Sequence, residues 1–255
     1  MITKDFTYEP ESRTAYCCAE KLMGTRIEIL LTDIEKRAAE LLCDFLIDSV
    51  ASADSLLNRF DHSSEVSRLN SAIIAAAKSP DLTPMSPELS AWGCLAETYR
   101  AKTGGAFDVR YAGEYDFGGL AKGAMLSRAA QALRDRGVHD ALLNFGGSSI
   151  LGLGHHPFGD AWKVDVPDPF SGRTLVTVKL RDSAMSVSGN TPGYGGHIVD
   201  TQTGERVLAS RVVVVTAPDP TDAEVLSTSI MANPTRRETL LAAFPGASAQ
   251  IFDNL

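Results

Sequence analysis

The sequence predicts a single α+β domain, and three observations favour this class. Helical periodicity dominates the chain before Gly137 and strand-like segments dominate after it, so no continuous β-α-β alternation is present. The 255 residues contain no internal repeat, low-complexity tract or Pro/Gly linker, and they are enough for one sizeable core. We therefore expect one domain over residues 1–255, with residues 1–20 as an irregular N-terminal extension.

The helices are predicted from apolar spacing and from capping residues. Apolar side chains three and four apart, from Asp33 to about Leu57, are typical of a helix with one buried face. Ser86 is a suitable N-cap for a helix from Pro87 to Thr103, and Gly137 ends another that starts at Ala121. Two shorter helices are expected near Asp222–Met231 and Arg236–Phe244.

The strands are predicted from alternation and from short β-branched runs. Residues 22–31 alternate apolar and polar side chains, which is the period of a half-buried strand. A polar loop, Asp61–Ser64, precedes a short segment, Glu65–Asn70. Further strands are expected at Ala141–Phe145, Trp162–Val166, Leu175–Leu180, Ala184–Val187, Arg211–Thr216 and Ser248–Phe252.

The charge balance excludes two classes of partner. Asp and Glu number 32 against 24 Lys and Arg, which gives a net charge of −8. Such a surface repels nucleic acids and anionic membranes, so neither is expected as a partner, and no membrane span is expected. An acidic protein that handles a nucleotide normally uses a divalent cation to offset the repulsion.

The cysteines and the N-terminus indicate a cytoplasmic protein. No metal-ligand spacing and no export signal accompany Cys17, Cys18, Cys43 and Cys94, so reduced thiols are expected rather than disulfides. The first residues lack an apolar stretch, and no lipoprotein signal precedes Cys17. We expect a cytoplasmic protein, although a chain trimmed of its leader would have the same sequence.

The most informative segment runs from Asp116 to Gly123 and reads Asp-Phe-Gly-Gly-Leu-Ala-Lys-Gly. A carboxylate, glycines and a lysine stand directly before a predicted helix, whose first turn offers unpaired N–H groups to a phosphate. The segment is not the common nucleotide phosphate loop, because its spacing differs from G-x-x-x-x-G-K-[ST]. It indicates a phosphate-binding helix entrance of another kind.

Three other segments accompany this one in a fixed order: Met23-Gly-Thr25 before it, then Asn144-Phe-Gly-Gly147, then His197-Ile-Val-Asp200 with Thr203-Gly204. Together the four segments resemble those of the ApbE-like FAD:protein FMN transferases. The resemblance implies a T-fold-related domain with a mostly antiparallel sheet and flanking helices. It also implies a Mg²⁺-dependent enzyme that splits FAD, releases AMP and joins FMN through a phosphoester to an acceptor flavoprotein. The acceptor residue would be a Ser or Thr in a flavinylation motif.

A candidate metal site lies on the last long helix. Glu224 and Thr228 are four residues apart and Ser227 is three from Glu224, so their oxygens share one face. This pattern suits part of a Mg²⁺ shell, but spacing alone favours a solvated face whose hydroxyls bond to the helix backbone. The resemblance favours the metal and implies the carbonyl of Gly119 as a further ligand. Asp222 is expected to cap this helix.

One candidate ligand differs from the family pattern. The resemblance implies Asp at this position of the helix, whereas this chain has Glu224. The extra methylene moves the carboxylate by about 1–1.5 Å, which is comparable with the tolerance of an octahedral Mg²⁺ site. Either the site has adjusted to the longer side chain or its metal binding is weakened.

Lys122 and His197 are the expected catalytic residues. A lysine ammonium can neutralise a pyrophosphate, and a histidine that titrates near neutral pH suits proton transfer. The resemblance implies that both lie beside FAD, with His197 as a base for the acceptor hydroxyl. It also implies that Asp116 contacts FAD, although the residues alone also allow an Asp that satisfies N–H groups of a turn. Asp200 is expected to order the turn that follows it, where Thr201 replaces the family's usual Pro.

The resemblance implies three further FAD contacts. These are Met23, Phe60 and the segment Ala106-Phe107-Asp108. Phe60 stands where the family usually has Tyr, and it keeps a stacking face without the hydroxyl. Both Met23 and Phe60 are apolar enough to be core residues instead.

The largest departure from the family lies between Asp108 and Asp116. Only the segment from Val109 to Tyr115 separates them, where relatives usually carry a much longer one. A shorter segment would open the nucleotide cleft. Two alternatives therefore stand beside the transferase: an FAD pyrophosphatase, in which water replaces the acceptor, and a non-catalytic FAD-binding relative.

Overall fold

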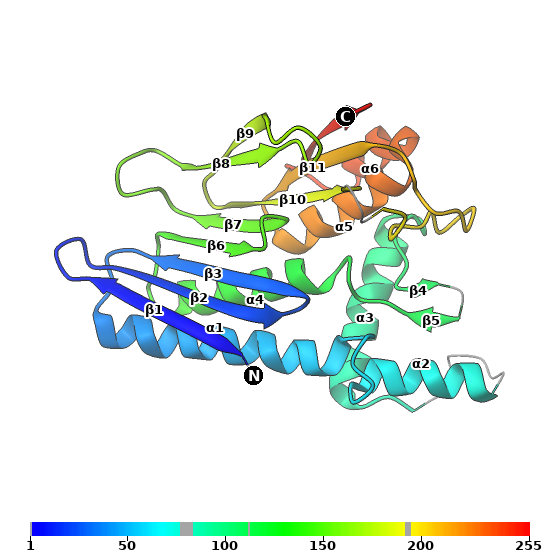
Figure 1. Cartoon of the computed structure of the whole chain (residues 1–255), viewed down its shortest axis with the longest axis horizontal. Helices are drawn as coiled ribbons and strands as arrows, with labels where there is room; N and C mark the ends of the chain where they lie inside the picture. The colour runs from blue at the N-terminus through cyan, green and yellow to red at the C-terminus, as the bar shows by residue number, and fades with distance from the viewer. Residues whose placement is uncertain (1, 77–83, 112, 192–194) are drawn as a thin grey trace.

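The computed structural model describes residues 2–76, 84–111, 113–191 and 195–255. Its main element is an eight-stranded sheet in the order β1-β2-β3-β6-β7-β10-β11-β12, with every neighbouring pair antiparallel (Figure 1). These strands span Thr3–Glu9, Thr14–Leu22, Thr25–Leu31, Ala141–Phe145, Ser149–Leu153, Ser183–Gly189, Arg211–Ala217 and Ser248–Asp253. The predicted α+β class with a mostly antiparallel sheet is confirmed.

Six α-helices lie within the described residues, and three of them, α1, α4 and α5, pack on one face of the sheet (Figure 1). Each of these three presents a buried apolar side, such as Leu42, Leu46 and Val50 of α1. The helices span Lys36–Leu57 (α1), Glu65–Ala76 (α2), Pro87–Lys102 (α3), Ala121–Asp135 (α4), Pro220–Ala232 (α5) and Arg237–Ala242 (α6), with a 3₁₀ turn at Pro234–Arg236.

A hairpin covers part of the other face of the sheet. Its strands are β8 (Trp162–Pro167) and β9 (Thr174–Leu180), and Trp162 packs with Met185 of β10 in a second apolar cluster. The indole N–H of Trp162 donates to the carbonyl of Leu153 at 2.7 Å, which fixes the hairpin on β7. The centre of the sheet is therefore buried on both faces.

The expectation of an irregular extension over residues 1–20 is wrong. The segment forms β1 and most of β2, which pair in register from Thr3 with Glu20 to Glu9 with Thr14. The buried face of β2 consists of Ala15, Cys17 and Ala19, which are small and not β-branched. Ala and Cys have little intrinsic preference for strands. The strand therefore forms because it pairs with β3.

Other element boundaries differ more modestly from the prediction. The segment that begins at Glu65 continues as helix α2 to Ala76, and β7 was not predicted. Asp219 rather than Asp222 caps α5, since its side chain accepts the N–H groups of Thr221 and Asp222. The side chain of Asp222 instead accepts the hydroxyl of Tyr99 at 2.7 Å, which joins α5 to α3.

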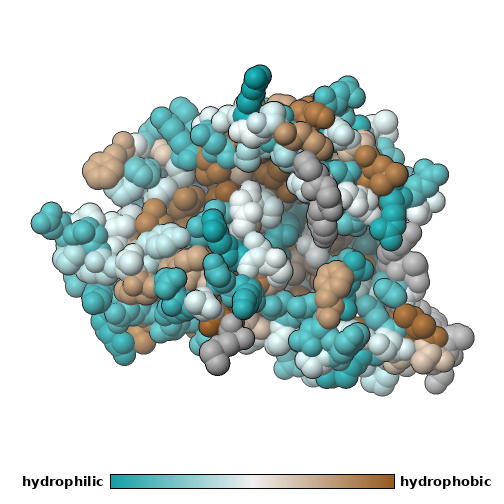
Figure 2. Space-filling view, in the orientation of Figure 1, coloured by the Kyte–Doolittle hydropathy of each residue, from teal (hydrophilic) through white to brown (hydrophobic). Residues whose placement is uncertain are grey.

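The surface carries no broad apolar area on the side seen in Figure 2, where hydrophobic residues occur in small groups among hydrophilic ones. Among the described residues, no helix is long and apolar enough to cross a membrane.

Candidate active site

The glycine-rich segment Asp116–Gly123 is held in place by the residue before it. Tyr115 ends β5 (Glu114–Tyr115), and Asn70 of α2 binds both of its backbone groups. The Asn70 amide donates to the Tyr115 carbonyl at 2.9 Å and accepts its N–H at 2.7 Å. Phe117 stacks on the Tyr115 ring, and Asp116 accepts the N–H of Gly118 at 2.8 Å. The segment therefore enters α4 from a fixed position.

Two glycines of this segment lie where a larger side chain would contact neighbouring residues. A Cβ on Gly119 would lie 3.1 Å from the hydroxyl oxygen of Thr228 and 3.2 Å from the Phe107 ring. A Cβ on Gly123 would lie 2.6 Å from the Pro220 carbonyl oxygen and 2.7 Å from Cβ of Glu224. Glycine is therefore required at position 123 for the start of α4 to lie directly against α5, and Gly119 is tightly packed. This contact places the predicted metal ligands Gly119, Thr228 and Glu224 in one region.

Glu224 is the centre of a buried polar network. Its side chain is almost completely buried, and Oε1 lies 2.9 Å from the ammonium nitrogen of Lys122. Oε2 accepts hydrogen bonds from Ser149 at 2.6 Å and from Ser186 at 2.9 Å. These two serines are directly opposite each other on β7 and β10. The carboxylate is thus satisfied by one cation and two hydroxyls.

Ser227, which the sequence also placed among the metal ligands, lies inside this network. Its side chain is fully buried and its hydroxyl hydrogen bonds to those of Ser186 at 2.9 Å and Ser188 at 2.8 Å. The hydroxyl also lies 3.0 Å from the backbone carbonyl of Glu224. This arrangement directs the Ser227 oxygen toward the sheet.

His197 lies close enough to Lys122 and Asp116 for their charges to act on its imidazole. Partial burial lowers the pKa of His197, the ammonium of Lys122 lowers it further, and the carboxylate of Asp116 opposes both effects. Asp116 also pairs with Arg59 at 3.3 Å, and the Arg59 guanidinium lies 4.7 Å from the centre of the Phe60 ring. Predicted catalytic and FAD-binding residues from three segments therefore meet here.

Hydrogen bonds fix the segment that carries His197. The side chain of Asn190 accepts the N–H of Gly196, next to His197, at 3.2 Å and donates to the carbonyls of Val207 and Ala209. Asp200 accepts the N–H of Gln202 at 2.9 Å, as expected for a residue that orders the following turn. The Thr201 hydroxyl donates to the carbonyl of Gly105 at 2.7 Å. Threonine at this position thus ties the histidine segment to the start of Ala106-Phe107-Asp108.

The segment Met23-Gly-Thr25 forms the turn between β2 and β3. Met23 and Gly24 have φ angles of +48° and +73°, as a two-residue hairpin turn of this kind requires. A Cβ on Gly146 would lie 2.1 Å from the hydroxyl oxygen of Thr25, so Gly146 must be glycine for the two segments to meet. Gly24, Thr25 and Gly146 line an open hollow of about 720 Å³.

The other predicted FAD contacts differ in exposure. Phe60 is 78% exposed, so the alternative of a core residue is wrong for it. Met23 is half-buried against the core. Ala106 and Phe107 are buried, and Phe107 touches the region of Gly119, whereas Asp108 accepts the N–H of Arg110 at 2.8 Å.

Sequence reasoning missed Arg59, Asn70, Ser149 and Ser186. A signal was present for Ser149, because it is a polar residue at the start of an otherwise apolar strand, whereas Ser186 lies in a strand with two further serines. Arg59 and Asn70 carried no such signal, since polar residues are ordinary in a loop and on a helix.

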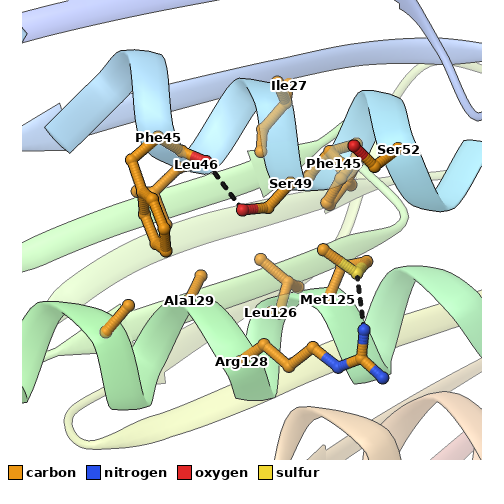
Figure 3. Close-up of a pocket in the computed structure, with 12 residues that line it drawn as sticks. Ile27, Phe45, Leu46, Ser49, Ser52, Met125, Leu126, Arg128, Ala129 and Phe145 are labelled. Carbon is orange, nitrogen blue, oxygen red and sulfur yellow. Dashed lines mark hydrogen bonds between the residues drawn. The ribbon is translucent and has the colours of Figure 1, made fainter. Parts of the chain in front are cut away.

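A separate cavity lies between α1 and α4 (Figure 3). Its volume is about 380 Å³, and Phe45 and Ser49 of α1 face Leu126 and Ala129 of α4 across it. None of the predicted site residues lines it.

The sequence model of the ApbE family matches residues 23–113 and 112–251, which together are most of the chain. The chain belongs to the ApbE family. The two matched parts meet at the short segment Val109–Tyr115, which the structure describes except for residue 112. There, the pairs Arg110–Tyr111 (β4) and Glu114–Tyr115 (β5) form a small hairpin.

Solved structures of ApbE proteins share the fold. A flavin transferase ApbE from Vibrio cholerae, an H257G mutant, superposes with a TM-score of 0.76 at 16% identity, covering 95% of this chain and 94% of that one. The apo form of the Pseudomonas stutzeri flavinyl transferase ApbE gives 0.73 at 18% identity, covering 100% and 91%.

A curated FAD:protein FMN transferase from Rhodobacter capsulatus is 39% identical over 98 residues. The match covers 35% of this chain and 18% of that protein.

Proposed function

We propose that this protein is an FAD:protein FMN transferase. An oxygen of a Ser or Thr on an acceptor flavoprotein bonds to the FMN phosphorus of FAD, the bond to the AMP phosphate breaks, and AMP leaves. The observation that carries the proposal is the meeting of Lys122, Asp116 and His197 at the start of α4. The names of the similar proteins from three bacteria support the same reaction.

His197 acts as the base. Its lowered pKa keeps the imidazole neutral at pH 7, so that it can accept the proton of the acceptor hydroxyl. The side chain remains exposed, which suits a residue that must meet an acceptor protein. The Asn190 and Thr201 hydrogen bonds hold its segment in place during this step.

Lys122 binds the pyrophosphate. It lies in the first turn of α4, where backbone N–H groups and the helix dipole also favour phosphate oxygens. Its ammonium therefore compensates the negative charge that develops on the AMP phosphate as the bond breaks.

The flavin end of FAD contacts the exposed ring of Phe60 and the turn at Met23, while Ala106, Phe107 and Asp108 line the cleft. The exposure of Phe60 beside the Arg59–Asp116 ion pair supports this placement, because an accessible ring can stack on an isoalloxazine.

Mg²⁺ fits the residues present at the start of α4. Among the described residues, no three His, Cys, Asp or Glu side chains are grouped so that they could hold a metal ion, so a site made wholly of such ligands is not expected. Mg²⁺ requires only one or two carboxylates beside other oxygens and substrate phosphates. Gly119, Glu224 and Thr228 offer a carbonyl, a carboxylate that already holds one cation, and a hydroxyl. When bound, the ion would supply further charge compensation to the pyrophosphate.

The test is an incubation of the protein with FAD, Mg²⁺ and an acceptor protein that carries a flavinylation motif. A gain in acceptor mass equal to FMN less water, with matching AMP release, would establish the transferase. AMP and free FMN without a modified acceptor would identify an FAD pyrophosphatase. Intact FAD would identify a binding protein, provided that an established transferase modifies the same acceptor in parallel.

The His197→Ala variant separates chemistry from binding. It should bind FAD normally and lose about 100-fold or more of the transfer rate, which is the usual contribution of a general base. An unchanged rate would remove His197 from the mechanism.

A further inference from the structure

The two oxygens of the Glu224 carboxylate have different partners. Oε2 points to the sheet, where the paired residues Ser149 and Ser186 hold it. Oε1 holds the ammonium of Lys122. One oxygen of this carboxylate is therefore hydrogen bonded to the interior of the protein, and the other can bind a cation.

The longer side chain of Glu224 fits this arrangement. The carboxylate reaches the two serine hydroxyls on β7 and β10, and these hydrogen bonds determine its orientation. The side chain of Lys122 is 21% exposed and that of Glu224 is 5% exposed, so the lysine is the more exposed of the pair. An ion that approaches Oε1 from solvent meets the lysine ammonium first.

We propose that Lys122 and a divalent cation compete for Oε1 of Glu224. In the FAD-free protein the lysine ammonium is the counter-ion of this carboxylate and weakens metal binding. The pyrophosphate of FAD attracts the ammonium away, which frees Oε1 for the ion. Mg²⁺ and FAD therefore bind cooperatively, and each raises the affinity for the other by the same factor. This inference rests on the proposed function, because it concerns the same site.

The test measures metal binding without acceptor protein and without turnover. Mg²⁺, and Mn²⁺ as a spectroscopic substitute, are titrated into the FAD-free wild-type protein and into the Lys122→Gln variant. The variant should bind both ions about tenfold or more tightly, because a positive charge next to the carboxylate is gone. Lys122→Arg keeps the charge and should stay near the wild-type affinity.

Lys102→Gln is the matched control. Lys102 pairs with Asp222, another carboxylate of α5, at 3.3 Å, and its loss changes the net charge by the same amount. Its metal affinity should equal that of the wild-type protein. A thermal melt of each variant without metal shows that the proteins compared are folded.

Two results would overturn the inference. One is a Lys122→Gln variant that is folded and binds Mg²⁺ no more tightly than the wild type. The other is an equal gain in Lys102→Gln, which would reveal a general effect of net charge. Both results are independent of transferase activity, so the inference and the proposed function can fail separately.

Discussion

The ammonium of Lys122 lies 2.9 Å from one carboxylate oxygen of Glu224, although 102 positions separate the two residues in the chain. Glu224 is almost completely buried, and two serine hydroxyls satisfy its second oxygen. The hydrogen bonds of a fully paired, buried carboxylate are lost when the side chain that carries it is shortened. This pair therefore links the stability of the protein to its proposed chemistry.

Shortening this side chain should cost stability. In Glu224→Asp the carboxylate no longer reaches Ser149 and Ser186, which leaves buried hydroxyls with fewer partners. We expect the free energy of unfolding to fall by about 1–3 kcal/mol. Urea denaturation measures the change, and Glu238→Asp on the exposed surface of α6 is the control. Equal midpoints for wild type and Glu224→Asp would contradict the serine network.

A methyl group at Gly123 should force α4 and α5 apart. Its Cβ would lie 2.6 Å from the Pro220 carbonyl oxygen, so we expect Gly123→Ala to destabilise the protein by about 1–3 kcal/mol. Gly93→Ala in α3 has open space around the new methyl group and should stabilise by about 0.5–1 kcal/mol. Thermal melts of the two variants should therefore shift in opposite directions, and a shared direction would refute the contact.

The pH dependence follows from the lowered pKa of His197. The neutral imidazole is the active form, so kcat/KM should fall as the pH falls through a pKa below the ordinary value of about 6.5. NMR titration of the FAD-free protein tests the causes. Lys122→Gln should raise the pKa of His197, because a positive neighbour is lost, and Asp116→Asn should lower it. Shifts of the opposite sign would show that Lys122 and Asp116 do not act on His197 in this way.

Phe60 should contribute to FAD affinity without contributing to stability. The ring is 78% exposed, so Phe60→Ala should leave the melting temperature unchanged. Loss of a stacking contact of about 0.5–1.5 kcal/mol should weaken FAD binding by about 2- to 13-fold in a fluorescence titration. Phe158→Ala removes a ring that is 91% exposed and assigned to no site, and it should bind FAD like the wild type. A similar loss in both variants would argue against stacking at Phe60.

Local patterns in the sequence predicted most elements of the fold. The capped helix at Ser86–Pro87 and the alternation in β3 are short-range features, and both are present. The strand β2 was missed because most of its buried residues are Ala and Cys, whose placement depends on pairing across the sheet. Long-range pairing of this kind leaves little trace in a local pattern.

The candidate site shows the same limit. Helical spacing correctly predicted that Glu224 and Thr228 share a helix, and motif order brought Lys122 and His197 to the same region. The ion pair between Lys122 and Glu224 could not be predicted, because it requires the close contact of α4 with α5 at Gly123. The inward orientation of Ser227 likewise depends on strands that lie far away in sequence.

The backbone clamp of Asn70 on Tyr115 has a consequence for evolution and engineering. Asn70 of α2 holds both backbone groups of Tyr115, and the N–H of Asp116 donates to the carbonyl of Val109 at 2.7 Å, so the base of the hairpin is fixed on both sides. Segments of other lengths can therefore be exchanged between Arg110 and Tyr115 while the residues at the start of α4 keep their places. The length of the hairpin can therefore change without moving Asp116 and Lys122.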